Sequence, residues 1–333
     1  MIKLIIKSLA VTGVLFSIMA NEASAVILST HAKNSQETYN VSSYSYTPYM
    51  SNYSVTGDYL NYSKKNLEEG GRVSYDKNGI PMIFYYGKPF YNPVTLSNLA
   101  LAEHGRYLRN WDVNTRKNFL KYAEALISMQ SKDGSFRYAF PFKKPEYNYT
   151  YKPGWVSAMP QGEALSVYSR AYRLTNDKKY LEAGKRSLEF LQVSKTNGGV
   201  MTDLGDISSK WKDYIWFEEY VTPKNNYTLN GYMFVLLGLY DWSKLEVQGD
   251  YGQQQANSLF NRGIQSLKKV LPKYDMGGFT MYDLSYYTMK TKKPHVVIGY
   301  HAVHIYQLKA LYSITNEPSL LSRSNLWASY VKK

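Results

Sequence analysis

The chain has 333 residues, of which 44% are apolar and 20% charged, a composition typical of a globular protein and not of a disordered, collagenous or coiled-coil chain. It contains no cysteine, which excludes a disulfide scaffold, a zinc–thiolate site, an iron–sulfur cluster and a thiol nucleophile. The net charge of +14 and the 34 tyrosines favour an anionic polymer over a redox cofactor as the partner.

Residues 1–25 have the pattern of a secretory signal peptide. Lys3 and Lys7 precede an apolar run over residues 8–20, and Ala23-Ser24-Ala25 is a small-residue cleavage site. The run is too short to span a bilayer, and no later run is long and apolar enough, so we expect no stable membrane insertion. We therefore expect a secreted or surface-exposed protein, and secretion without cysteine favours a bacterial source.

Residues 26–70 form an N-terminal arm rich in tyrosine, serine and asparagine. Such a composition fits an ordered arm held by its tyrosines as well as a loose surface tail. Residues 71–92 then alternate around Asn78-Gly79, a dipeptide that strongly predicts a hairpin turn. We expect a β-hairpin there, with Pro81 on an edge strand.

Over residues 93–333 the apolar positions recur with the period of helices. Residues 119–127 make one apolar face, for which Asn114 or Thr115 would be the N-cap. The run 233–239 is apolar nearly all round, as expected of a helix enclosed by other helices. We therefore predict a large helical domain over 93–333.

A weak repeat runs through this helical part. Predicted helices end at the glycine turns Asp133-Gly134, Gly198-Gly199 and Gly277-Gly278, and each turn precedes a short alternating stretch. Helical hairpins that each end in a glycine turn on the same rim are typical of an α/α toroid or part of one. We therefore predict a mainly α fold with a small N-terminal β-hairpin appendage, and place the site at the rim and the central cleft.

Several segments of the helical part resemble, in order and spacing, the C-terminal domain of the D-glucuronyl C5-epimerase family, which includes heparosan-N-sulfate-glucuronate 5-epimerases. The matching segments are Gly154-Trp155, 157–162, 216–220, 229–231, 238–241, 282–284 and 300–308, and they cover roughly residues 92–333. The resemblance implies an incomplete α/α toroid, or barrel, of helical hairpins. A β-rich domain precedes it in the animal members, and here that domain must be absent or much reduced.

The resemblance further implies an isomerase that converts D-glucuronate into L-iduronate residues in a polysaccharide, without a metal or an organic cofactor. The C5 hydrogen lies next to a carboxylate, so its removal requires a base on one face, an acid on the other, and a group that neutralises the carboxylate. Carried over by position, Glu219 and Tyr300 match the family's proposed acid/base pair. Tyr220 and Tyr282 match further catalytic tyrosines, and Asn230 matches a substrate-contacting asparagine.

Three more residues complete the predicted substrate-binding set. Trp155 and Gln161 belong to the matching segments, and His304 shares a polar helical stripe with Tyr300, which suggests a cleft on so apolar a helix. Ser285 stands where many members have an arginine that holds the substrate carboxylate.

Lys212, Arg137 or another cation must then hold the carboxylate. The alternative is a non-catalytic protein that binds a glycan or a host surface, which Ser285, the shortened N-terminal half and the tyrosine-rich arm favour. The same C5 proton abstraction, followed by loss of the C4 substituent, would instead make it a polysaccharide lyase.

Other partners are less consistent with the sequence. His301 and His304 have a spacing that suits metal ligands, but no third ligand cluster accompanies them. The lysines and arginines are dispersed, with no basic helix, which favours an anionic, uronic-acid polysaccharide over nucleic acid. A homodimer is an expectation inherited from the family.

Overall fold

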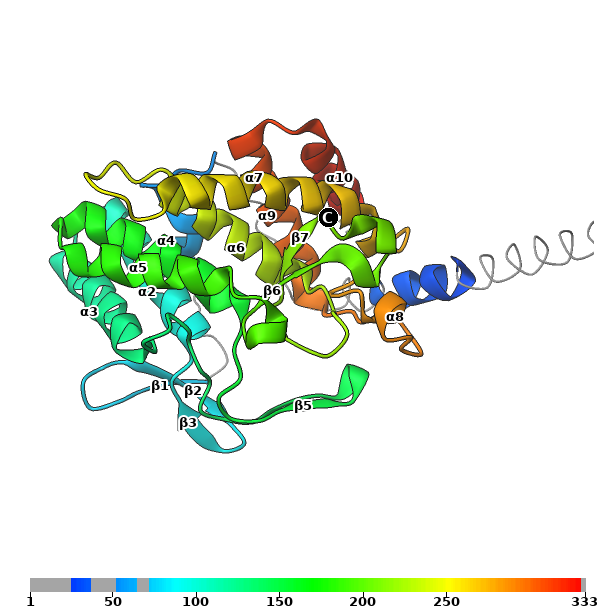
Figure 1. Ribbon diagram of the computed structural model, residues 1–333, viewed down its shortest axis with the longest axis horizontal. Helices are drawn as coiled ribbons and strands as arrows, with labels where there is room; N and C mark the ends of the chain where they lie inside the picture. Colours follow the sequence, from blue (N-terminus) through cyan, green and yellow to red (C-terminus); the bar gives the residue numbers. More distant parts are fainter. Residues whose placement is uncertain (1–24, 37–51, 65–71, 331–333) are drawn as a thin grey trace, which may run out of the picture.

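The computed structural model describes residues 25–36, 52–64 and 72–330 (Figure 1). The predicted signal peptide lies outside these residues except for Ala25, and so do residues 37–51 and 65–71 of the predicted arm and hairpin segments. No helix in the described part of the chain is long and apolar enough to cross a membrane.

Helices dominate the described residues. A helix over residues 25–36 comes first, followed by α2 (Pro93–Asn110), α3 (Val113–Met129), α4 (Ala158–Thr175), α5 (Lys178–Leu191), α6 (Leu229–Ser243), α7 (Gln253–Val270), α8 (Ser285–Thr288), α9 (Ile298–Thr315) and α10 (Pro318–Ser329). The 3-10 helices are η1 (Tyr59–Lys64), η2 (Pro145–Tyr147), η3 (Lys195–Asn197), η4 (Leu204–Asp206), η5 (Ser209–Trp211) and η6 (Leu271–Tyr274).

The strands are short and form three small antiparallel sheets. They are β1 (Val73–Tyr75), β2 (Pro81–Tyr85) and β3 (Lys88–Phe90) in one sheet, β4 (Phe142–Lys144) with β5 (Tyr149–Tyr151), and β6 (Met201–Asp203) with β7 (Ile215–Phe217). β1 and β2 join across Asn78-Gly79 with Gly79 at φ 71°, as the dipeptide indicated, and β3 adds a strand that the sequence did not suggest.

The long helices pack as consecutive pairs in two layers. α2 contacts α3, α4 contacts α5, α6 contacts α7, and α9 contacts α10. The first helix of each pair also contacts the first helix of the next, in the order α2, α4, α6, α9, and η1 contacts both α2 and α9. The prediction of a mainly helical fold is confirmed.

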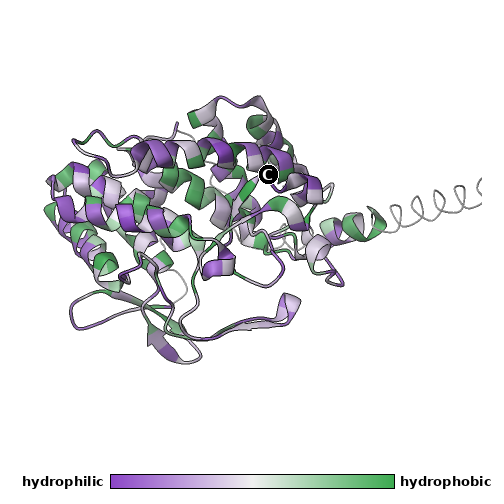
Figure 2. Ribbon diagram, viewed as in Figure 1, coloured by the Kyte–Doolittle hydropathy of each residue, from purple (hydrophilic) through white to green (hydrophobic). Residues whose placement is uncertain are grey.

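The inner position of α6 follows from its sequence. Every residue of α6 from Leu229 to Leu239 is buried, which confirms the prediction for 233–239. Figure 2 shows hydrophilic and hydrophobic residues alternating along α5 and α7, as expected of helices with one face in water. Gly162 of α4 and Gly238 of α6 allow the two helices to approach closely, because a Cβ on Gly238 would overlap the carbonyl oxygen of Gly162.

The predicted N-cap of α3 is wrong. The helix begins earlier, and Asp112 caps it by accepting a hydrogen bond from the backbone N–H of Asn114 at 2.8 Å. Val113 in the first turn is exposed, so the apolar face starts later than the helix itself. An apolar face marks only the packed part of a helix, and an aspartate just before it is an equally good cap.

The three glycine turns lie where the repeat predicts them, with Gly134 at φ 84°, Gly198 at φ 82° and Gly277 at φ 77°. They follow α3, α5 and the α7–η6 segment, and each leads into a short β pairing. From there the chain runs to Tyr138, to Glu219 and to Tyr282 respectively. The repeat therefore delivers three segments to one region of the molecule.

Residues 52–64 pack into the helical core, as in the ordered alternative for the arm. Tyr53, Tyr59 and Tyr62 are buried there. The Tyr53 hydroxyl donates a hydrogen bond to Asp241 of α6 at 2.8 Å, and Asp241 forms a fully buried ion pair with Arg170 of α4 at 2.5 Å. This segment thus ties two inner helices together.

Candidate active site

A pocket of about 280 Å³ lies between β2, the start of α2, the segments that follow the first two glycine turns, the loop before α4 and the start of α9. Its walls include Glu219, Tyr220, Tyr300 and Trp155 from the predicted site, together with Tyr85, Asn92, Val94, Thr95, Asn98, Tyr138, Phe140, Phe142, Ser157 and Met159. The structure therefore brings together side chains from α9, from the end of β7 and from the loop before α4.

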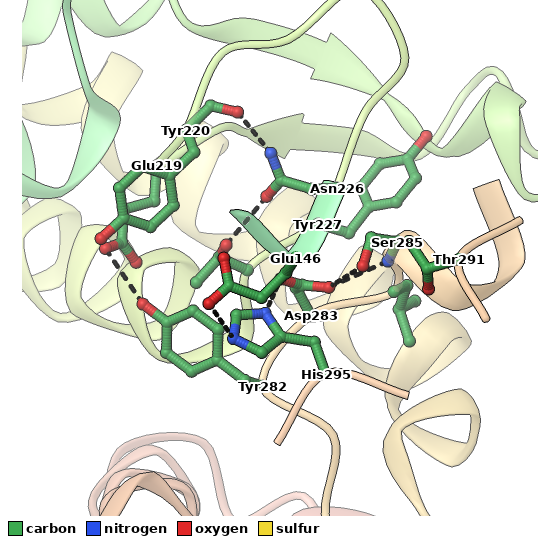
Figure 3. A network of polar contacts seen from close by, with 12 residues as sticks. Glu146, Glu219, Tyr220, Asn226, Tyr227, Tyr282, Asp283, Ser285, Thr291 and His295 are labelled. Carbon is green, nitrogen blue, oxygen red and sulfur yellow. Dashed lines mark hydrogen bonds and ion pairs between the residues drawn. The ribbon is translucent and has the colours of Figure 1, made fainter. Parts of the chain in front are cut away.

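Glu219 follows the end of β7 and reaches the start of α6. Its carboxylate lies against Gly231, where the Cβ of any other residue would overlap the Oε2 atom. The Tyr282 hydroxyl donates a hydrogen bond to Oε1 of Glu219 at 3.4 Å, as Figure 3 shows, and Oε2 has no partner among the described residues. The carboxylate is thus held by Tyr282 at Oε1, while Oε2 is buried beside Gly231 without a hydrogen bond.

The protonation of Glu219 is set by its surroundings. Burial raises the pKa of Glu219 to about 7, while the Lys144 ammonium and the hydroxyls of Tyr220 and Tyr282 act in the opposite direction. A carboxylate with a pKa near neutrality can both accept and release a proton at physiological pH. Glu219 therefore has the properties required of a general base.

The predicted site tyrosines surround Glu219. The ring centroids of Tyr282 and Tyr300 are 5.0 Å apart. Burial and the charge of Glu219 raise the pKa of both Tyr220 and Tyr282 well above the ordinary value, so both are hydrogen-bond donors at neutral pH. Tyr300 lies at the second residue after the start of α9, half-buried, on the wall of the pocket.

Aromatic rings form much of the remaining wall. Trp155 stacks on Tyr138 with ring centroids 3.8 Å apart and on Phe142 at 5.7 Å, and Tyr85 of the hairpin stacks on Phe140 at 4.0 Å. Pockets for organic ligands are usually lined by such rings with a few polar groups among them. The hairpin thus contributes a wall of the pocket.

Three predicted substrate-binding residues lie outside the pocket lining. Asn230, Gln161 and His304 are fully buried. With its amide suitably oriented, Gln161 bonds the carbonyl of Gly134 and the N–H of Phe136, each at 3.0 Å, so it holds the first glycine turn. His304 contacts the hydroxyl of Thr280 at 3.1 Å. A direct role in binding substrate stays a prediction for these three residues.

The serine in place of the family's arginine has a partner of its own. The Ser285 hydroxyl donates to Asp283 at 2.6 Å, and Nδ1 of His295 contacts the other oxygen of Asp283 at 2.5 Å (Figure 3). His295 also faces Glu146 at 3.6 Å. This network lies directly behind Tyr282, because the His295 carbonyl accepts from the Tyr282 N–H at 2.8 Å.

Neither cation candidate from the sequence lines the pocket. Arg137 pairs with Asp133 at 2.7 Å and is half exposed, and Lys212 is exposed. A cation that the sequence did not single out is Lys144, a buried lysine that is not on the pocket wall but whose ammonium lies 3.8 Å from the ring centroid of Tyr220, which is. In the sequence, the adjacent lysines Lys143 and Lys144 would be expected on the solvent-exposed surface. Within the described residues no group of three or more His, Asp or Glu side chains converges as metal ligands would.

Comparisons with known proteins show the family to which the chain belongs. Residues 129–329 match the family model of the D-glucuronyl C5-epimerase C-terminus. The D-glucuronyl C5-epimerase of Caenorhabditis elegans is 34% identical over 219 residues, which are 64% of this chain and 34% of that protein. The chain thus spans about a third of the length of that relative. An uncharacterized protein of Methanocaldococcus jannaschii is 28% identical over 255 residues, 72% of this chain and 73% of that one.

A solved structure is similar in fold. The cellobiose 2-epimerase of Spirochaeta thermophila superimposes with a TM-score of 0.50 at 12% identity, covering 77% of this chain and 63% of that chain. The match of the family model, which spans more than half of the sequence and contains Glu219, Tyr282 and Tyr300, decides the assignment. The chain belongs to the D-glucuronyl C5-epimerase C-terminus family.

Proposed function

We propose that the protein inverts C5 of D-glucuronate residues in a polysaccharide, which yields L-iduronate residues. The observation that carries the proposal is Glu219, a buried carboxylate with a pKa of about 7 on the wall of an aromatic pocket that also contains Tyr300. Membership of the epimerase family supports the same reaction.

In the proposed mechanism Glu219 and Tyr300 act on opposite faces of the sugar. The Glu219 carboxylate accepts the C5 proton, and the electron pair of the C–H bond passes into the adjoining carboxylate group as an enolate. The Tyr300 hydroxyl then donates a proton to the other face of C5. In the reverse reaction the two residues exchange roles.

One turnover leaves Glu219 protonated and Tyr300 ionised, so each must regain its starting protonation state. Tyr282 contacts both, through its hydroxyl 3.4 Å from Glu219 and its ring 5.0 Å from that of Tyr300. The net proton balance is restored through solvent: half-buried Tyr300 takes up one proton from water, and Glu219 releases one.

The finer features of the protein belong to the same proposal. The two layers of helix pairs form an incomplete α/α toroid, with the pocket at the rim where the glycine turns emerge. The signal-peptide pattern supports secretion, and the net charge of +14 supports an anionic, uronic-acid polysaccharide as substrate.

The proposal is tested by exchange at C5. The purified protein is incubated in deuterium oxide with heparosan-type and other glucuronate polymers, and the C5 proton is followed by NMR. Deuterium at C5 together with new iduronate signals is the expected result. An unsaturated product absorbing in the ultraviolet would instead indicate a lyase, and binding without exchange on any uronate polymer would leave a glycan-binding protein.

The pH dependence of the reaction follows from the pKa of Glu219. The base must be ionised to accept a proton, so kcat/KM is expected to fall about tenfold per pH unit below an acid limb near pH 7. Glu218 is the internal control, because burial raises its pKa to about 8 but it is not on the pocket wall. The acid limb of kcat/KM near pH 7 should therefore persist in Glu218→Gln. A limb at pH 4–5 in the wild type, the ordinary range of glutamate, would contradict the assignment.

A further inference from the structure

The side chain of Lys144 is buried beside the proposed base. Lys144 is the last residue of β4 and is 8% exposed, whereas its neighbour Lys143 points into solvent. Its ammonium lies 3.8 Å from the ring centroid of Tyr220 and 5.2 Å from that of Tyr282. Both tyrosines also flank the Glu219 carboxylate.

The ammonium of Lys144 has no carboxylate partner. Among the residues that the structure describes, no ion pair or hydrogen bond holds it, in contrast to the buried guanidinium of Arg170, which pairs with Asp241 at 2.5 Å. Removing a charge from water is costly unless an opposite charge compensates, and aromatic faces compensate only in part. The Lys144 ammonium therefore has unused capacity to bind an anion.

The surroundings of Lys144 couple it to the base, although Lys144 itself is not on the pocket wall. Burial lowers the pKa of Lys144, while the carboxylates of Glu219, Asp283 and Glu146 act in the opposite direction. Tyr220, which lines the pocket beside Glu219, lies directly against the ammonium, so a shift of the flexible lysine side chain past this ring brings it to the site. A uronate whose C5 lies at Glu219 has its carboxylate carbon one C–C bond, about 1.5 Å, from C5.

We propose that Lys144 binds the carboxylate of the uronate residue whose C5 faces Glu219. The inference rests on the proposed function. The ammonium neutralises the carboxylate in the bound substrate and stabilises the charge that spreads onto it when the C5 proton leaves. Lys144 thereby takes the place of a cation that Ser285 does not supply.

Binding tests the inference without relying on turnover. The probes are a heparosan oligosaccharide and its carboxyl-reduced form, in which each glucuronate is a glucose. Wild-type protein is expected to bind the carboxylated probe at least about tenfold more tightly. For Lys144→Met, the dissociation constants of the two probes should differ by no more than about threefold. Lys144→Arg should keep part of the preference for the carboxylated probe. Lys143→Met, which removes an equal charge one residue away, should behave as the wild type.

Kinetics give the second readout. Lys144→Met is expected to lose about 10²–10³-fold in kcat. Its acid limb should also move to higher pH, because the ammonium lowers the pKa of Glu219. A purely structural role would not move this limb. Below pH 7, where Glu219 is protonated, the Tm of Lys144→Met should not fall, since an apolar side chain of similar length then replaces a buried charge that has no ion-pair partner. If this variant does not fold, Lys144→Gln replaces it in every assay.

The outcomes separate this inference from the proposed function. If the wild type shows no C5 exchange but loses its preference for the carboxylate in Lys144→Met, the epimerase proposal fails and the role of Lys144 stands. If the wild type exchanges C5 and Lys144→Met keeps the preference for the carboxylated probe, the inference about Lys144 is overturned, whatever happens to the acid limb.

Discussion

Replacing Glu219 by glutamine is expected to abolish C5 exchange, with a loss of at least about 10³-fold, and to leave the polysaccharide bound. Glutamine keeps the shape of the side chain but cannot accept the C5 proton, and a positioned base contributes about 10²–10⁴-fold. Because Glu219 is the base in one direction and the acid in the other, inversion should fail in both directions. The measurements are deuterium incorporation at C5 of glucuronate polymers and the appearance of the inverted residue from glucuronate and from iduronate polymers.

The same substitution should raise stability above pH 7. The folded-state pKa of Glu219 is raised to about 7 from an ordinary 4.5, so the folded protein binds more protons than the unfolded chain between these values. Ionising the buried carboxylate therefore costs stability as the pH rises, up to about 3 kcal/mol above pH 7. Glu219→Gln removes this cost. Urea unfolding at pH 5 and pH 8 should show the gain chiefly at pH 8.

Two further variants isolate the role of Glu219. Glu218→Gln changes a second buried carboxylate one residue away, whose Oε1 accepts the Tyr227 N–H at 3.2 Å, and it should retain exchange within about threefold of the wild type. Tyr300→Phe should still exchange the C5 proton of glucuronate but return it to the same face, so deuterium enters without inversion. Inversion at the wild-type rate in Glu219→Gln would refute its role as the base.

The parts of the fold that local sequence determines could be predicted. Glycine turns such as Gly134 require a left-handed backbone that few other residues adopt, and the run 233–239 has no polar face to place in water. The hairpin at Asn78-Gly79 is set by the turn dipeptide alone. Glu219 and Tyr300 were identified through the family motifs, and the structure places both on one pocket.

The parts of the structure that depend on contacts between distant segments could not be predicted from the sequence. Lys144 is buried because Tyr220 and Tyr282, from two other repeats, close over it, and nothing next to it in sequence distinguishes it from Lys143. Gln161 belongs to a family motif, yet its amide holds the backbone of the first glycine turn. A motif identifies a position that matters but does not separate a substrate contact from a support beneath the site.

The sequence also did not predict the buried ion pair of Arg170 and Asp241. Breaking this pair should have the largest effect on stability. Asp241→Leu leaves the guanidinium of Arg170 buried without its carboxylate and removes the acceptor of the Tyr53 hydroxyl. The expected loss is about 3–5 kcal/mol in the free energy of unfolding. Tyr53→Phe, which removes the hydrogen bond to Asp241 and a long one from Arg170 but keeps the ion pair, should cost about 1 kcal/mol. Urea unfolding measures both.

The double variant Arg170→Met/Asp241→Leu decides whether the stability lost in Asp241→Leu comes from losing the ion pair or from leaving the Arg170 charge buried alone. Replacing both ions by apolar side chains removes the uncompensated charge, so most of the loss should be recovered. Recovery of less than about 1 kcal/mol would contradict this account.

Activity need not return with stability. Arg170 also donates to the carbonyl of Ser54 at 3.1 Å, and residues 52–64 run from there into η1, which contacts both α2 and α9. α2 begins at the pocket wall, and α9 carries Tyr300. The double variant is therefore expected to fold well but to exchange C5 more slowly than the wild type, with Tyr300 less firmly held opposite Glu219. Wild-type rates in the recovered protein would show that the ion pair serves stability alone.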